Sequence, residues 1–114
     1  DSVAPLEAIA AALVAAGTLL QERREYAQQR QFVIAAHAEL RERELIKLAS
    51  LAAALADALR HRGISEPAAS LAAEAGIAVF KVAFERWILD TNQGELPQLI
   101  RESLDELKVL IAGA

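Results

Sequence analysis

The sequence of 114 residues contains no cysteine and no methionine, and only 4% of its residues are aromatic. Without cysteine the chain can form neither a disulfide nor a thiolate metal site, which excludes a small secreted protein stabilised by disulfides. The same absence fits the reducing environment of the cytoplasm, where we expect this protein to reside. Because methionine is absent and the first residue is Asp1, we expect the chain to be a piece of a longer product.

Concentrated positive charge and membrane-length apolar segments are also missing. The formal net charge is −4, and no stretch gathers lysine and arginine on a face free of acidic residues. Because phosphate groups are bound by such faces, we expect no direct contact with nucleic acid. The apolar segment at residues 8–20 is too short to span a bilayer, and it lacks the preceding cationic residues of a signal peptide. We therefore predict neither a membrane span nor a targeting segment.

Strong helix formers, chiefly alanine, leucine, glutamate and arginine, dominate the sequence, and 54% of the residues are hydrophobic. Apolar residues recur at spacings of three and four, which predicts an all-α, five-helix bundle that forms one domain over residues 1–114. We expect Gly63 to end the third helix and Ser65 to cap the fourth, with Pro67 in its first turn. The predicted helices lie at about residues 4–20, 21–36, 38–61, 66–91 and 95–112, with a turn at 92–94.

The predicted fourth helix has apolar residues on both flanks. Only a narrow stripe with Glu74, Lys81 and Glu85 is charged, so this helix must be buried from two sides. It could run through the middle of one subunit. However, the fifth helix also has a one-sided apolar stripe, which favours a second copy of the chain as the cover. We therefore predict a homodimer in which the last two helices of each subunit form a four-helix bundle. The predicted interface residues are Leu71, Ala75, Ala78, Val82, Leu89, Leu96, Ile100, Leu104, Leu107 and Ile111.

The predicted second helix carries polar residues on the face that should point inward, which is unfavourable unless a ligand, water or partner satisfies them. We therefore predict an apolar ligand cavity enclosed by the first three helices and the inner flank of the fourth. Arg30 would lie near its mouth and hold an anionic group, unless it is an ordinary surface arginine. Phe80, Phe84 and Trp87 could line the cavity, fill the core or contact the dimer partner. The predicted lining residues are Leu13, Leu20, Tyr26, Arg30, Val33, Leu48, Leu55 and Phe84.

No catalytic or metal-binding pattern occurs in the sequence. A Ser/His/Asp set, a phosphate-binding glycine loop and a cluster of metal ligands are all missing, so we predict no enzyme, no metal and no cofactor. His37 and His61 lie at predicted helix ends, where capping or exposure is expected. The alternating charges of residues 41–44 could mark a binding patch, but a run of this kind at the start of a helix is usually a solvated, self-paired face. The alternative to a ligand-sensing domain is a purely structural helical dimerisation module without a small-molecule site.

Two segments are similar to a known family. The run AAEAGIAVFKVAFERWILDTNQGELPQLIRESLDELK, residues 72–108, resembles the last two helices of TetR-type transcriptional regulators. Residues 32–76 resemble the preceding helices in the mycofactocin-regulator-like branch of that family. The order of RERE, an Ala/Leu-rich helix and the FERW segment carries the likeness, which covers nearly the whole chain.

This resemblance implies an N-terminal helix-turn-helix domain that is absent from this chain and that would bind operator DNA. We interpret the protein as a repressor, although the residues do not distinguish repression from activation. The family likeness also implies dimerisation through the last two helices and a cavity for a small apolar or acyl-type effector, such as an acyl-coenzyme A thioester. Where the branch has a Thr-Pro pair opening the third helix, this sequence has His37 and Ala38, so we expect a softer kink there.

Overall fold

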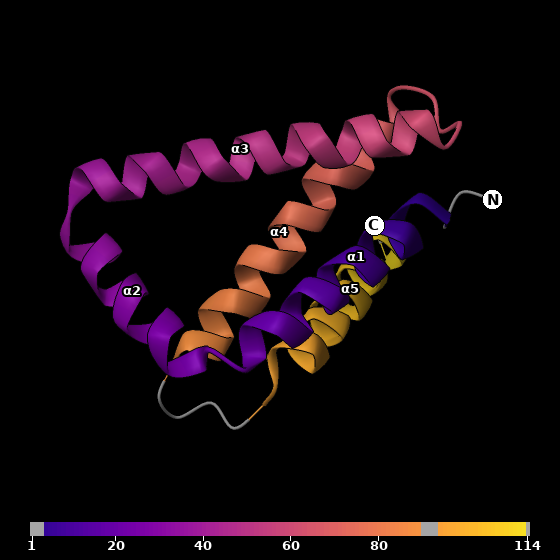
Figure 1. Ribbon diagram of the computed structural model, residues 1–114. Helices are drawn as coiled ribbons and strands as arrows, with labels where there is room; N and C mark the ends of the chain where they lie inside the picture. Colours follow the sequence, from indigo (N-terminus) through magenta and orange to yellow (C-terminus); the bar gives the residue numbers. More distant parts are fainter. Residues whose placement is uncertain (1–3, 90–93, 114) are drawn as a thin grey trace.

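The computed structural model describes residues 4–89 and 94–113, and within these ranges the chain forms five helices and no strand (Figure 1). The predicted all-α class is thereby confirmed. The third helix has the predicted bounds, and the others differ from the prediction by a few residues. The helices are α1 (Ala4–Gln21), α2 (Arg24–Ala36), α3 (Ala38–His61), α4 (Ala68–Ile88) and α5 (Leu96–Gly113).

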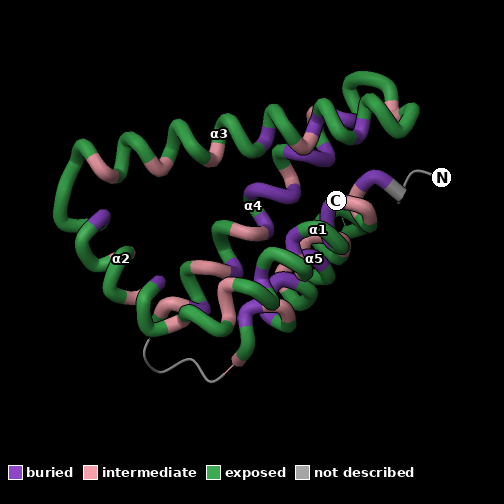
Figure 2. The backbone as a smooth tube through the Cα atoms, viewed as in Figure 1, coloured by how far each residue is buried: buried purple, intermediate pink, exposed green. Residues whose placement is uncertain are grey.

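Three of the helices, α1, α4 and α5, pack together, and α2 and α3 form an arm beside them (Figure 1). The C-terminal half of α3 lies on α4, where Ala52, Ala56 and Leu59 of α3 are buried. From there α3 extends to a sharp corner, and α2 connects this corner to the other end of α4. Within α2 only Ala27 and Ile34 are buried, and Figure 2 shows that most of the arm is exposed. The arm is therefore held by far fewer buried side chains than the rest of the fold.

A polar junction joins α1, α4 and α5 inside the core. Trp87, Leu96 and Ile100 are the largest fully buried side chains. The side-chain oxygen of Gln21 accepts a 2.8 Å hydrogen bond from Nε1 of Trp87 and a 2.7 Å bond from the backbone N–H of Leu96. A buried indole N–H needs such an acceptor. Gln21 therefore allows Trp87 to be buried completely where the three helices meet.

Two side chains of α2 bind the C-terminal end of α4, whose last carbonyls have no partner within the helix. The guanidinium of Arg24 donates to the carbonyl oxygens of Trp87 and Leu89, at 2.9 and 3.2 Å. The side-chain amide of Gln28 donates to the carbonyl oxygen of Ile88 at 3.1 Å. The N-terminal half of α2 is thus fixed to the end of α4.

The start of α4 differs from the prediction. The helix begins at Ala68 after Pro67, and no side chain of the N-cap residue bonds to it, so the prediction that Ser65 caps this helix was wrong. The carboxylate of Glu66 accepts hydrogen bonds from Ser70 and Arg60 instead, and both lower the pKa of Glu66 below its usual value. At its other end α4 stops at Ile88, because Leu89 is extended. The predicted end near Thr91 and the turn at Asn92 and Gln93 lie outside the described residues.

The corner between α2 and α3 consists of His37 alone. Its backbone is extended, with φ −129° and ψ 117°, so the helix is fully interrupted rather than softly kinked as we expected. The last carbonyls of α2 find partners beyond the helix: Nδ1 of His37 lies 2.9 Å from the oxygen of Val33, and Arg41 donates to the oxygen of Ala35. Because these contacts give the last carbonyl oxygens of α2 hydrogen-bond partners, a sharp turn forms here without proline.

The contact between α1 and α4 requires glycine at position 76. A Cβ atom built on Gly76 would lie 2.2 Å from Cγ2 of Ile9, and the χ1 angle of isoleucine in a helix has little freedom to move that methyl away. We therefore expect Gly76→Ala to lower the free energy of unfolding by about 1–3 kcal/mol, as overpacking does. Chemical denaturation measures this change. Gly113→Ala is the control, since nothing lies within 4 Å of a Cβ there, and equal stability of the two variants would contradict this packing.

Candidate functional site

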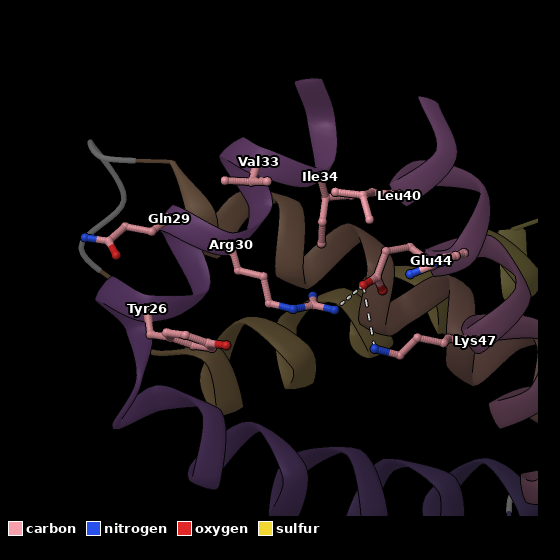
Figure 3. A pocket seen from close by; sticks show the side chains of 9 residues that line it. Tyr26, Gln29, Arg30, Val33, Ile34, Leu40, Glu44 and Lys47 are labelled. Atoms are coloured by element: carbon pink, nitrogen blue, oxygen red, sulfur yellow. Dashed lines mark hydrogen bonds and ion pairs between the residues drawn. The ribbon is translucent and has the colours of Figure 1, made fainter. Parts of the chain in front are cut away.

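Two adjoining grooves lie along the arm and represent the candidate ligand site. The first, of about 500 Å³, lies between α2 and α3 and is called the outer groove (Figure 3). The second, of about 530 Å³, lies between α2, α3 and α4 and is called the central groove. The outer groove is lined by Tyr26, Gln29, Arg30, Val33, Ile34, Leu40, Arg43, Glu44 and Lys47. The central groove is lined by Leu20, Arg30, Gln31, Ile34, Arg41, Glu44, Leu45, Leu48, Phe80, Lys81, Phe84 and Glu85.

The apolar surface of the central groove comes largely from aromatic and leucine side chains. Phe80 and Phe84 of α4 are half-buried there, with ring centroids 5.8 Å apart. Phe84 also contacts Trp87, at 5.6 Å between centroids, but Trp87 itself is fully buried in the core. The three aromatic residues of this flank therefore have different environments: Phe80 and Phe84 line the groove, and Trp87 fills the core. Leu20 and Leu48 add aliphatic surface from α1 and α3.

Basic side chains outnumber acidic ones around the two grooves, although the chain as a whole is acidic. The acids are Glu44 and Glu85. Among them, Glu44 is paired with Arg30 across the corner and lies 3.6 Å from Nζ of Lys47. Lys81 makes no ion pair with any residue that the structure describes. The basic residues are Arg30, Arg41, Arg43, Lys47 and Lys81. An apolar surface beside five cations is chemically suited to a molecule with an apolar body and an anionic group.

The structure separates the predicted lining residues. Leu20, Arg30, Leu48 and Phe84 line the central groove together. Tyr26 and Val33 line the outer groove with Arg30, and they are 59% and 49% exposed, so this part is open to solvent rather than enclosed.

Two of those residues lie elsewhere. Leu13 is buried in the core and faces Gly76, and Leu55 packs against the same core. The helical spacing that grouped them with the groove residues does not show which neighbour covers each turn. Sequence reasoning did not select Glu44, Arg41 or Lys81, because a charged residue on a helix is usually exposed.

A second surface lies on the opposite side of α4. Its flank residues Leu71, Val82 and Leu89 are 65%, 51% and 58% exposed. Ala78 is exposed and Ala75 is half-buried. A third groove, of about 440 Å³, runs here between α4 and α5; it is bordered by the 3.5 Å ion pair of Arg86 and Glu102. The apolar residues that line this α4–α5 groove are Ala78, Val79, Val82, Leu107 and Leu110.

Three residues assigned to the dimer interface belong to the core of the subunit instead. Leu96 and Ile100 are fully buried, and Leu104 is 4% exposed, because α5 packs this side of its stripe against α1 and α4. They have no surface left for a second chain. Leu107 is half-buried and Ile111 is 60% exposed, so the end of α5 remains accessible.

Neither a metal site nor a membrane span is found among residues 4–89 and 94–113. No three acidic or histidine side chains there lie close enough together to hold a metal ion. None of the described helices combines the length and apolar character needed to cross a bilayer.

Among the described residues the chain is all-helical, with a ligand-sized groove on one side of α4 and an exposed apolar flank on the other. Residues 3–111 match the family model described as the MftR C-terminal domain, a TetR C-terminal domain of the mycofactocin-regulator branch. The match covers nearly the whole chain, and the protein belongs to this family. No curated protein matches the sequence.

Proposed function

We propose that this domain is the effector-binding part of a TetR-type transcriptional regulator and that it binds an amphiphilic anion of the acyl type in its central groove. The observation that carries the proposal is the phenylalanine-lined surface of the central groove beside Arg30, Arg41 and Lys81, in a chain of net charge −4. Arg43 and Lys47 add two more cations in the adjoining outer groove. The apolar surface would bury an acyl chain, at about 0.8 kcal/mol for each methylene removed from water. The cations would hold a carboxylate or the phosphates of a coenzyme A group.

An acyl-coenzyme A thioester with a long chain is expected to stabilise the folded domain by mass action. At a concentration of about 100 times its Kd, the stabilisation is about 2.7 kcal/mol, or on the order of 10 °C in Tm. Thermal denaturation with a series of acyl chain lengths measures it. Arg30→Ala should reduce the shift for anionic compounds more than for neutral ones, because only the former need the guanidinium.

Equal losses for anionic and neutral compounds would remove Arg30 from this role. If no acyl compound shifts Tm, the domain is a structural dimerisation module, which is the alternative function. The exposed α4–α5 flank is compatible with that alternative because it does not depend on a ligand.

We further propose that two copies associate through the exposed flank of α4 and the C-terminal half of α5. Leu71, Val82 and Leu89 form an apolar surface with Leu110 and Ile111 that would be unusual on a monomer. A twofold axis placing this surface against itself would bury both copies at once. Leu96, Ile100 and Leu104 are left out of this revised interface, because they are buried within the subunit.

Val82→Glu is expected to weaken this dimer by on the order of 3 kcal/mol, because it places an unpaired charge in the interface. Analytical ultracentrifugation measures the change, and circular dichroism should show an intact fold. Leu104→Glu is the matched comparison: it introduces the same charge into the core and should unfold the subunit. A Val82→Glu variant that dimerises like the original chain would place the interface elsewhere.

Operator binding is assigned to a helix-turn-helix domain N-terminal to this chain, with the ligand releasing a repressor from DNA inside the cell. The acidic net charge supports this division of tasks. We expect no sequence-specific binding of duplex DNA by residues 1–114 alone in a gel-shift assay. Preference for one DNA sequence over a scrambled duplex would overturn this part of the proposal.

A further inference from the structure

Three residues line both grooves: Arg30 and Ile34 of α2 and Glu44 of α3. Arg30 and Glu44 form an ion pair that connects the two helices, and Figure 3 shows Arg30 and Lys47 converging on the Glu44 carboxylate. The pair therefore stands where the outer and central grooves meet. Arg30 and Glu44 thus form part of the boundary between the two grooves.

The carboxylate of Glu44 lies between two of the cations that line the grooves. One of its oxygens binds Arg30 and lies within ion-pair distance of Lys47, so both cations face an acid supplied by the protein itself. The side chain of Glu44 is 26% exposed, against 41% for Arg30 and 65% for Lys47. Glu44 is thus the least exposed member of the cluster, and an incoming anion would compete with it for both cations.

We propose that Glu44 is a gate for the site described under the proposed function, on which this inference rests: an acidic amphiphile binds by displacing the Glu44 carboxylate from Arg30 and Lys47, which joins the two grooves. When a ligand carboxylate replaces the Glu44 carboxylate at the same two cations, the electrostatic free energy changes little. A small anion therefore gains no binding free energy by breaking the ion pair. A ligand that also lays an apolar chain over Phe80 and Phe84 gains about fourfold in affinity for each buried methylene. The gate selects molecules that carry both an anionic group and a chain.

This inference distinguishes Glu44 from a residue that merely ties α2 to α3. A residue that only connects α2 to α3 contributes stability. Its removal would weaken the binding of every ligand that requires the arm to stay in place. If Glu44 instead competes with the ligand, its removal raises the affinity for anionic ligands, because Arg30 and Lys47 become available to them. The sign of the change in anion affinity therefore separates the two roles.

The test compares decanoate with 1-decanol, which share a chain and differ in charge, by isothermal titration calorimetry. Glu44→Gln keeps the shape of the side chain and removes its charge. We expect it to bind decanoate about fivefold more tightly than the original chain, equivalent to about 1 kcal/mol, the upper value for a solvent-exposed ion pair. Its affinity for 1-decanol should be unchanged. Glu42→Gln is the control, because it removes the same charge from α3 at an exposed position that lines neither groove.

Each outcome is decisive. Tighter decanoate binding in Glu44→Gln alone supports the gate. An equal gain in decanoate affinity in Glu42→Gln would show that the effect comes from net charge alone. Unchanged or weaker decanoate binding in Glu44→Gln would show that the ion pair only connects α2 to α3. Either result overturns the gate and leaves the proposed function standing. If neither compound binds any variant, the proposed function fails together with the gate.

Discussion

The fold depends on the polar junction at the C-terminal end of α4. Gln21 accepts hydrogen bonds from Trp87 and Leu96, and α2 supplies Arg24 and Gln28 to the last carbonyls of α4. A buried polar group left without a partner costs about 1–3 kcal/mol. Each of these part-buried bonds therefore spares the junction part of that cost. It fixes α1 and α2 to α4 and α5 at a single place, although the two pairs of helices are far apart in sequence.

From this junction α4 runs between the two candidate surfaces. Phe80 and Phe84 face the central groove, and Leu71 and Val82 are exposed on the opposite flank. A ligand that separates α2 from α4 must either pivot α2 about the bonds of Arg24 and Gln28 or carry the end of α4 with it. In the second case the ligand alters the helix that carries the exposed apolar flank. The junction is thus the physical connection between the two surfaces.

The sequence predicts the helices well because helical periodicity is a local property, and it predicts correctly that α4 has two apolar flanks. It cannot show what covers an apolar stripe. The stripe of α5 was assigned to a second subunit, yet Leu96, Ile100 and Leu104 are covered by the chain itself. Likewise Phe80, Phe84 and Trp87 share one flank, and only the path of α2 and α3 decides which of them lines a groove. Half of the predicted lining, including Leu20, Leu48 and Phe84, lies together because these residues face the place where the arm crosses α4.

The charged run at residues 41–44 shows why the character of the grooves was harder to foresee. On an isolated helix its alternating charges would pair with each other in solvent, but the break at His37 places Arg30 of α2 opposite Glu44. Arg41 and Arg43 border the grooves, whereas Glu42 does not. At physiological salt the Debye length is about 8 Å, so the acidic residues elsewhere on the chain are largely screened from this site. The electrostatic potential at the grooves is therefore determined by their local excess of basic residues rather than by the net charge of −4, and Glu44 is the acidic residue that pairs with two of these cations.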